Sequence, residues 1–431
     1  MATHTQNNTV RTIAVIGGGP SGATVAAFLA RAGFSVVIFD QGARPELVVG
    51  ESLVPQLVPI FRELGIEERV AQLGIKKPGV TVTFDAGEEI ELSFTAVRGV
   101  LPTYAYNVPR DAFDQLLINV AGESGARIVP QPAALEIDPR TKMARLQSES
   151  LGMVAEWNGA QPDLLIDATG RRRLFAKLAG IEAVVGERRD ISHFAHYENC
   201  PWPEPAGQVM TMRLACGWGW RIPLPGPKLS LGVVLNRDDA RRFGDTPEEQ
   251  LEGVIESDPR LKVELKDRRR VSPIATYANY QLISKAGSGP NWALVGDAFG
   301  FVDPMLSPGV CLALESAQKL ARAVLARGAS KSGLARRLDQ YWHWFAATLA
   351  AWQNLIDYFY DGRIFAMQKT GMDMGARFPG RLSDAMQRHV EKNLSGMASG
   401  AYIARPYSRF LLRFLGRYGI RGWEPADFAI R

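Results

Sequence analysis

The sequence predicts a mixed α/β fold with a parallel sheet, an inserted antiparallel sheet and a helical C-terminal region. Three observations predict it. An apolar, β-branched run at 11–16 leads through a glycine-rich turn into a helical run and a second apolar strand at 35–40, which is a βαβ opening. Strand-like segments separated by Pro and Gly turns fill 190–275. After about residue 332 the sequence becomes helical and rich in aromatic side chains.

Length, composition and charge exclude several classes of protein. A chain of 431 residues exceeds one ordinary domain, and 46% hydrophobic with 22% charged residues is typical of a folded chain. The net charge of +5 is not gathered into a basic stripe, so we expect no nucleic-acid partner. Three widely spaced cysteines without a CxxC predict neither a disulfide framework nor a metal site. The polar N-terminus and the lack of an apolar run of ~18 residues predict a cytoplasmic protein without a transmembrane segment.

The remaining elements follow from local patterns. Alternating residues on either side of Gly87 predict a hairpin of strands 80–84 and 89–94. Apolar runs and glycine stops predict, in order, a helix at 110–123, a strand at 163–170, a strand at 292–297 and a helix at 310–327.

The glycine-rich turn has the spacing of a dinucleotide-binding motif, Gly17-x-Gly19-x-x-Gly22. Gly17 permits the tight turn, Gly19 lets the backbone approach a pyrophosphate, and Gly22 lets the helix pack close to the strand. The helix N-terminus offers free N–H groups and a positive dipole to the phosphates. Asp40, at the end of the second strand, is placed to accept a hydrogen bond from a ribose. The motif predicts a Rossmann-like dinucleotide site.

Two later strand ends indicate FAD rather than NAD. The run Asp167–Gly170 closes one strand, and Val295–Ala298 closes another, with Asp297 placed to reach a ribityl or pyrophosphate hydroxyl. The loop 304–310 then leads into a helix N-terminus, whose backbone amides can hold negative charge on a flavin ring.

The predicted domains follow from this order. They are a flexible tail at 1–10, an FAD-binding domain at 11–79, 99–180 and 285–330, an antiparallel substrate-binding domain at 80–98 and 181–284, and a helical C-terminal region at 331–431 that covers the substrate site.

Taken together, GGGPSG, DATG and GDAFGFVDP resemble the FAD-dependent monooxygenase superfamily with its hydroxylase-like fold. Two further motifs are similar to those of its flavin-dependent halogenases. The run 218–223 fits W-x-W-x-I-P, and 50–55 resembles the G-E-S/A-x-x-P loop. Lys77-Pro78-Gly79 resembles the K-x-G segment that carries a catalytic lysine in that family.

The resemblance implies an enzyme of secondary metabolism that uses FADH2 from a separate flavin reductase, O2, and chloride or bromide. In the family, hypohalous acid travels to the lysine, which aims it at an electron-rich ring, and two tryptophans wall the flavin off from the substrate. The implied catalytic residues are Lys77, Trp218, Trp220 and Glu51, with Lys76 as the rival lysine. The implied cofactor-binding residues are Gly17, Gly19, Pro20, Ser21, Gly22, Asp40, Ser52, Arg110, Asp297, Pro304, Gly309 and Val310, of which Gly309 and Val310 also bind halide.

Two departures from the tryptophan-specific halogenases bear on the class of aromatic substrate and on halide binding. Those enzymes place a Glu just before an S-x-G turn, where this chain has Met305-Leu306-Ser307-Pro308-Gly309. The missing acid favours phenols or pyrroles, whose own OH or NH activates the ring. Pro308 also removes one N–H donor from the turn, so halide would rely on Gly309 and Val310.

Two other enzyme classes share the cofactor. An FAD-dependent aromatic hydroxylase needs its substrate beside the flavin, so it predicts an open pocket behind Trp218 and Trp220. A saturase similar to geranylgeranyl reductases predicts a lipid-sized tunnel. A non-catalytic flavin-binding protein is a further alternative, and the two tryptophans could simply be core residues.

Two basic segments have open interpretations. Arg171-Arg172-Arg173 could contact a phosphate or form a solvated turn. Near the C-terminus an arginine recurs every four residues from Arg405 to Arg421, beside an apolar face of helical period that includes Phe410 and Phe414. Such a basic amphipathic helix could meet an acidic carrier protein that holds the substrate, bind an anionic membrane surface, or pack on its own domain.

Overall fold

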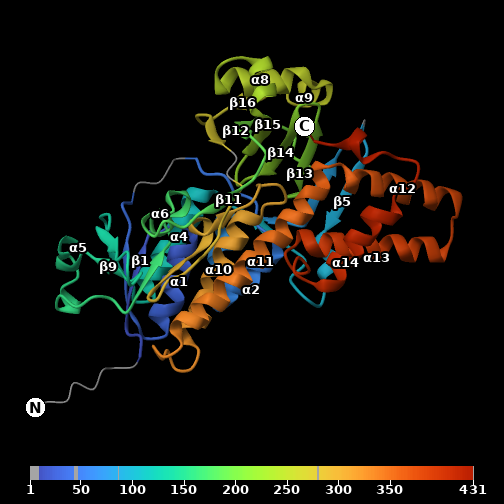
Figure 1. Ribbon diagram of the computed structural model, residues 1–431. Coiled ribbons are helices and arrows are strands. Elements are labelled where there is room, and N and C mark those ends of the chain that lie inside the picture. Colours follow the sequence, from blue (N-terminus) through green and yellow to red (C-terminus); the bar gives the residue numbers. More distant parts are fainter. Residues whose placement is uncertain (1–8, 43–46, 86, 279–280, 431) are drawn as a thin grey trace, which may run out of the picture.

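The computed structural model describes residues 9–42, 47–85, 87–278 and 281–430 (Figure 1). Its first layer is a five-stranded, wholly parallel sheet in the order β19-β10-β1-β2-β7. Its strands are β1 (Thr12–Ile16), β2 (Ser35–Phe39), β7 (Arg127–Val129), β10 (Leu164–Asp167) and β19 (Trp292–Leu294). In chain order the sequence of strands is 3-2-1-4-5, the doubly wound arrangement in which a ligand crevice opens beside the first strand.

Helices cover the parallel sheet because its central strands are apolar on both faces. Strands β1 and β10 are almost wholly buried. Helix α1 (Pro20–Arg31) packs against α4 (Arg110–Glu123) and α10 (Pro308–Leu325), and buried side chains of all three join one apolar core. Helix α1 thus begins directly after β1 and points its N-terminus at the crevice.

The second layer is an eight-stranded sheet in the order β16-β12-β15-β14-β13-β4-β5, with β17 beside β12. It is antiparallel except where β13 runs parallel to β4. Its strands are β4 (Gly79–Thr83), β5 (Glu89–Ser93), β12 (Asp190–Glu198), β13 (Val209–Leu214), β14 (Gly217–Pro223), β15 (Leu229–Asn236), β16 (Arg269–Arg270) and β17 (Ala275–Ala278). Two distant stretches of sequence therefore form one sheet, and α8 (Pro247–Ser257) and α9 (Pro259–Glu264) cover one of its faces.

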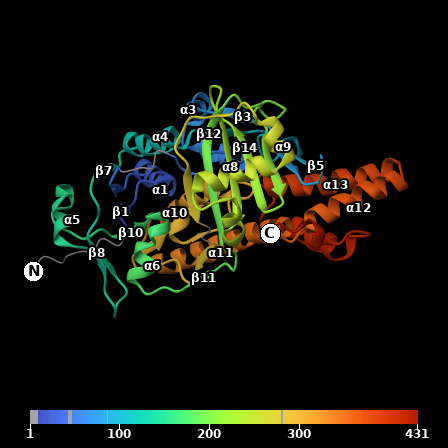
Figure 2. The same cartoon turned by 90° about the horizontal axis from the view of Figure 1, so that it is seen from above.

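The C-terminal region is helical. The long helix α11 (Leu334–Tyr360) runs along the body, and α12 (Arg363–Arg377), α13 (Arg381–Ala398) and α14 (Pro406–Phe414) form an end that projects beyond the sheets (Figures 1 and 2). None of the helices in the described part of the chain is both long and apolar enough to cross a membrane.

Shorter elements complete the fold. The helices are α2 (Val58–Glu63), α3 (Glu67–Leu73), α5 (Ser148–Gly152), α6 (Leu174–Leu178) and α7 (Arg237–Ala240). The strands are β3 (Ile75–Lys77) with β6 (Ala105–Asn107), β8 (Leu135–Ile137) with β9 (Ala144–Leu146), and β11 (Ala183–Val185), β18 (Leu282–Ser284) and β20 (Gly300–Phe301) in a three-stranded sheet.

Two sequence-based boundaries need correction. Residues 1–8 of the predicted tail lie outside the described residues, but Val10 is buried and its N–H bonds to the Ala329 carbonyl, so the tail boundary at residue 10 is wrong. The regular helix expected from Arg405 to Arg421 ends at Phe414 and continues as a π-type turn through Gly419. Two glycines in that turn, Gly416 and Gly419, weaken the helix there.

Candidate active site

A cavity of about 240 Å³ lies at the carboxyl ends of β1 and β10, where the strand order reverses. It gathers most of the residues that the sequence analysis singled out. Those that line it are Gly19, Pro20, Ser21, Glu51, Ser52, Arg110, Trp218, Trp220, Asp297, Pro304, Gly309 and Val310. Gly17, Gly22, Asp40 and Lys77 do not line it.

Glycines shape the end of the cavity at the N-terminus of α1. Gly17 has φ +105°, and a Cβ there would lie 2.4 Å from the Ala168 carbonyl oxygen. A Cβ on Gly22 would lie 2.0 Å from the Gly17 carbonyl oxygen, whereas a Cβ on Gly19 would meet open space. Gly17 and Gly22 therefore let helix and strand approach, and Gly19 leaves backbone open to a ligand. The carboxyl of Asp40 lies against this turn, since a Cβ on Gly18 would come within 2.7 Å of it.

This cradle fits the predicted FAD. The first N–H groups of α1 have no partner within the helix and carry its positive dipole, which suits a pyrophosphate. Arg110, at the start of α4, is buried and is held by Asp114 at 3.0 Å and by the Val49 carbonyl. When bound, FAD would supply the redox chemistry.

Arg171, whose role the sequence left open between a phosphate contact and a solvated turn, lines the cavity. Its guanidinium lies 4.8 Å from the Tyr277 ring centroid and 5.0 Å from that of Phe301. The interpretation as a solvated turn is therefore wrong for Arg171, although Arg172 is exposed. Burial raises the pKa of the nearby Asp297 carboxyl, and the charges of Arg171 and Arg110 oppose that rise.

Trp218 and Trp220 form one wall of the cavity. They lie two residues apart on β14, so both rings project from the same face of the sheet, with centroids 5.7 Å apart. Trp220 packs on Phe194 and sits opposite Gly232 on β15. A Cβ on Gly232 would lie 2.2 Å from the Trp220 ring. Only glycine therefore fits at this position of β15 without moving the ring.

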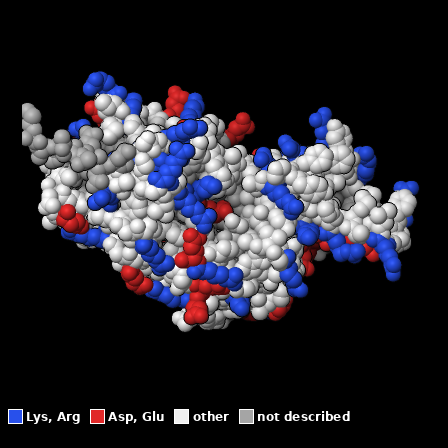
Figure 3. Space-filling view, turned by 90° about the horizontal axis from the view of Figure 1, so that it is seen from below, with Lys and Arg blue, Asp and Glu red and all other residues white. Residues whose placement is uncertain are grey.

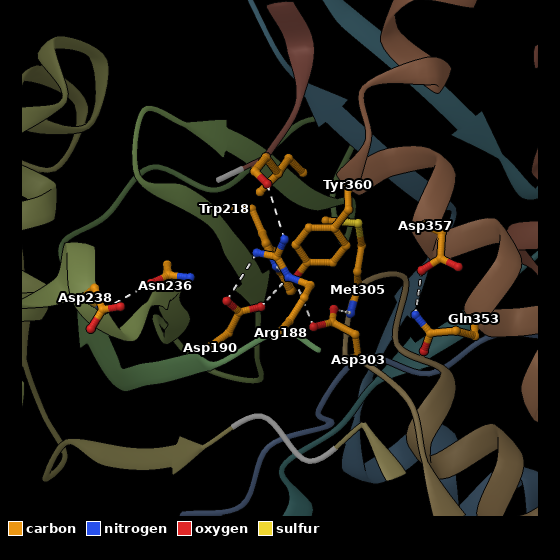
Figure 4. Close-up of polar contacts among 11 residues, drawn as sticks. Arg188, Asp190, Trp218, Asn236, Asp238, Asp303, Met305, Gln353, Asp357 and Tyr360 are labelled. Carbon is orange, nitrogen blue, oxygen red and sulfur yellow. Dashed lines mark hydrogen bonds and ion pairs between the residues drawn. The ribbon is translucent and has the colours of Figure 1, made fainter. Parts of the chain in front are cut away.

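Buried hydrogen bonds tie this wall to the loop that precedes α10 (Figure 4). Trp218 Nε1 donates to Tyr360 Oη at 2.8 Å, and Tyr360 Oη donates to Asp303 Oδ2 at 2.9 Å. Asp303 Oδ1 accepts from the Met305 N–H. Burial raises the pKa of Asp303 to about 6.

An ion pair, Arg188 with Asp190, packs against Tyr360 of this network. The Arg188 guanidinium lies 3.8 Å from the Tyr360 ring centroid and binds Asp190 at 2.6 Å. Sequence reasoning missed Tyr360 and gave Asp303 no role. The Asp-Pro step after GDAFGFV was the one available signal for Asp303.

The loop between Asp303 and α10 has a strained backbone. Leu306 and Ser307 both have positive φ, 64° and 60°, and both line the cavity. Helix α10 then begins at Pro308, which has no N–H. The N–H groups of Gly309 and Val310 belong to its first turn and lack helical acceptors. This geometry suits an anion beside the cavity.

Lys77 lies one hydrogen bond behind the cavity wall. Its side chain is completely buried, and Nζ donates to Ser52 Oγ at 2.7 Å and to the Leu53 carbonyl at 3.0 Å. Burial lowers the pKa of Lys77 to about 7. Lys76 points to the opposite side of β3 and is exposed, with Nζ 4.8 Å from the Tyr104 ring centroid. The geometry thus separates two lysines that the sequence could not.

The neighbouring Glu51 is buried in the same loop. Its Oε1 lies 2.5 Å from His196 Nε2 on β12. The loop 51–53 therefore joins the cavity to β12 through Glu51 and to Lys77 through Ser52. No cluster of potential metal ligands occurs among the described residues.

Comparison with known proteins places this geometry in a family. The model of the tryptophan halogenase family matches residues 12–84 and 96–364. The chain is 29% identical over 357 residues to a tryptophan 2-halogenase of Chondromyces crocatus, covering 81% of this chain and 67% of that protein. It is 30% identical over 342 residues to a flavin-dependent halogenase of Penicillium aethiopicum, covering 73% and 64%. The chain thus spans about two thirds of the length of these relatives.

A third relative and two solved structures are also flavin-dependent halogenases or carrier-protein chlorinases. A 1H-pyrrole-2-carbonyl-[peptidyl-carrier protein] chlorinase of Pseudomonas fluorescens is 27% identical over 332 residues, covering 71% of this chain and 74% of that one. The fold matches the flavin-dependent brominase Bmp2, with a TM-score of 0.74, 21% identity and coverage of 94% and 99%. It also matches the myxobacterial chondrochloren halogenase CndH, with a TM-score of 0.71, 24% identity and coverage of 98% and 100%.

The predicted fold class, the FAD cofactor and the resemblance to flavin-dependent halogenases are thereby confirmed, whereas the roles of individual site residues stay predictions. This chain belongs to the tryptophan halogenase family of flavin-dependent enzymes.

Proposed function

We propose that this protein halogenates an electron-rich aromatic ring of the phenol or pyrrole type, with Lys77 directing the oxidant. The balanced reaction consumes the aromatic C–H compound, halide, O2, FADH2 and one proton, and yields the aryl halide, FAD and two waters. The observation that carries the proposal is the position of Lys77. A fully buried amine, held by Ser52 and Leu53 against the cavity wall and lying 5.2 Å from the Phe94 ring centroid, is costly to bury, and such perturbed groups beside a cavity are typical of functional sites.

The chemistry of Lys77 follows from its burial. Because the pKa of Lys77 is about 7, its Nζ can donate a proton and take one back near neutral pH. As an ammonium it would hydrogen-bond the oxygen of hypohalous acid and make the halogen more electrophilic. When a ring carbon attacks the halogen, the departing hydroxide would take the ammonium proton and leave as water. The amine would then recover the proton that the ring carbon loses.

The wall supports halogenation over direct hydroxylation. A hydroxylase needs its substrate beside the flavin, but Trp218 and Trp220 are buried and fill that side with mutually packed rings. Gly309 and Val310 line the same cavity, so a small anion bound at their N–H groups would lie beside it. The lack of an acid in the run 305–309 supports a ring activated by its own OH or NH.

We propose two partners for this reaction. FADH2 would come from a separate flavin reductase, because the sequence carries a single dinucleotide fingerprint. The substrate could be tethered to a carrier protein, as it is for the 1H-pyrrole-2-carbonyl-[peptidyl-carrier protein] chlorinase of Pseudomonas fluorescens.

The test supplies the purified protein with FAD, a flavin reductase, NADH, O2 and bromide, and follows phenols, pyrroles and monochlorodimedone by mass spectrometry. The expected product is 78 mass units heavier than the substrate, the replacement of H by Br. Lys77→Ala should lower its formation by roughly 100-fold or more while FAD stays bound. Lys76→Ala is the matched control, with an exposed side chain on the same strand, and should retain activity.

Other outcomes would change the proposal in defined ways. Brominated product that survives Lys77→Ala would keep halogenation and reject Lys77 as the directing residue. A product 16 mass units heavier, formed whether or not bromide is present, would replace halogenation with hydroxylation. Carrier-tethered substrates complete the panel, and a panel without product would count against the proposal.

A further inference from the structure

The projecting C-terminal end of the molecule differs in charge from the remainder. We define the C-terminal lobe as residues 363–421, which contain α12, α13 and α14. It carries eleven Lys and Arg against three Asp and Glu, a net charge of +8. The whole chain carries +5, so the residues outside the lobe sum to −3. Figure 3 shows Lys and Arg spread over the projecting end of the molecule. The charge of this protein is therefore concentrated in its lobe.

Arg363 and Lys369, in the first helix of the lobe, form ion pairs with Asp361 and Glu88, but the basic side chains that follow them do not. From residue 377 to 421, all within the described chain, no Lys or Arg forms an ion pair with a described carboxylate. Arg377 and Arg381 are exposed at the turn between α12 and α13, and Arg413 and Arg417 are exposed beyond them on α14 and its π-type turn. Their charge is available to a partner.

Apolar side chains are exposed beside these arginines. At the α12–α13 turn, Phe378 is 62% exposed and Leu382 is 77% exposed. Four aromatic residues of the last helical segment are also exposed: Tyr407, Phe410, Phe414 and Tyr418. In both places an arginine precedes the apolar residue in sequence, as in Arg377-Phe378, Arg381-Leu382 and Arg413-Phe414.

An apolar groove opens among the same side chains. It has a volume of about 510 Å³ and lies between α12 and α13, with Met374, Phe378, Leu382 and Met386 on its walls. Arg381 also lines it. Nothing in this groove belongs to the cavity that holds the predicted FAD site.

We propose that the C-terminal lobe docks this protein on an anionic membrane surface, with its arginines at the lipid phosphates and the α12–α13 turn in the outer acyl region. Arginine beside exposed Phe, Leu and Met is the pattern of an interfacial segment, where the cation meets the headgroup and the apolar side chain enters the acyl boundary. A groove with apolar walls and an arginine accepts an acyl chain below its phosphate.

The observations favour a membrane over a protein occupant. A second copy would bring another charge of +8 against the first, which opposes self-association. An acidic folded protein would satisfy the arginines, but it offers no apolar phase for side chains at the free end of two helices. The inference does not depend on halogenation, since it rests on residues outside the cavity.

The experiment measures flotation of the full-length protein with vesicles of phosphatidylcholine alone and of phosphatidylcholine with phosphatidylglycerol. We expect flotation with the anionic vesicles, weakened by salt. Arg377→Glu with Arg381→Glu should lower the bound fraction constant about tenfold or more, because each basic residue near such a surface contributes about a fivefold factor. Phe378→Ser with Leu382→Ser should lower it as well.

Matched controls lie outside the C-terminal lobe. Val184→Ser with Val185→Ser replaces two exposed apolar residues of β11, and Arg140→Glu reverses an exposed charge near β9. Both should float like the unaltered protein. The proposal is overturned if the protein fails to float with anionic vesicles, if the lobe variants float unchanged, or if the controls lose as much. Capture by an acidic carrier protein without flotation would also overturn it, in favour of a protein partner.

Discussion

The flavin side of this molecule and its C-terminal lobe treat charge in opposite ways. Near the cavity, two arginines are held in ion pairs: the buried Arg110 with Asp114, and the partly buried Arg188 with the buried Asp190. Lys77 and Asp303 are buried too. Burial lowers the pKa of Lys77 and raises the pKa of Asp303, and both shifts favour the neutral form of the side chain. In the lobe, Arg377 and Arg381 stand in solvent beside exposed apolar side chains. The difference indicates that the cavity is organised for chemistry and the lobe for an external surface.

The largest effect on stability should come from the buried amine. We expect Lys77→Met to change how stability depends on pH. Below about pH 7 the amine is protonated in both states, but between about pH 7 and 10.5 it is protonated only when unfolded. The unfolded state binds more protons in that window, so the native protein gains stability as pH rises. The variant should lose this gain, which is on the order of several kcal/mol.

Urea unfolding at several pH values measures the effect as the difference between the protein and the variant. Lys76→Met serves as the control, because that side chain is exposed and should not alter the pH dependence. A difference between protein and Lys77→Met that stays constant across the window would mean that Lys77 is solvated in the native state.

A second prediction concerns the tryptophan wall. Gly232→Ala should destabilise the protein by roughly 1–3 kcal/mol, because the new methyl would overlap the Trp220 ring and Phe194. The displaced ring should also change the tryptophan fluorescence. Gly152→Ala, in α5 with open space around it, is expected to be neutral or slightly stabilising. Equal effects of the two substitutions on the unfolding midpoint would contradict the packing of the wall.

A third prediction tests the link between that wall and the loop before α10. Tyr360→Phe removes the hydroxyl that accepts from Trp218 and donates to Asp303. Two buried polar groups lose their partner, so unfolding should become easier by about 1–3 kcal/mol. Asp303 also holds the Met305 N–H ahead of the turn at Gly309 and Val310, where we propose that halide binds, so the KM for bromide should rise more than kcat falls.

Tyr358→Phe supplies the control for this substitution, since Tyr358 lies on the same helix and is not part of the network. A fall in kcat with an unchanged KM for bromide would contradict a positioning role for Tyr360. An unchanged stability would indicate that water replaces the hydroxyl.

The sequence predicted the parts of the site that local backbone rules control. Gly17, Gly19 and Gly22 have fixed spacing, and each answers to a steric requirement within one turn and its neighbouring strand. The parallel and antiparallel sheets follow from the same kind of local pattern. Motif resemblance added the wall and the lysine.

Contacts between distant segments could not be predicted in this way. Tyr360 meets Trp218 across 142 residues, and no periodicity in α11 marks that one tyrosine as a hydrogen-bond partner. Arg171 and Arg172 are indistinguishable in sequence, yet packing against Tyr277 turns only Arg171 to the cavity. The choice between Lys76 and Lys77 likewise needed the face of β3 that each occupies.

The smallest change in the free energy of unfolding should come from substitutions in the C-terminal lobe, and a small change would show that these residues are not part of the core. Phe378→Ser with Leu382→Ser removes two large apolar side chains, but both are already more than half exposed, so the free energy of unfolding should stay within about 0.5 kcal/mol. Leu355→Ala in α11, which removes a fully buried side chain, should cost about 2–5 kcal/mol in the same denaturant titration. If Phe378→Ser with Leu382→Ser lowered the free energy of unfolding as much as Leu355→Ala, these side chains would be packed in solution. The lobe would then be part of the core, and the two residues would not be available to contact lipid.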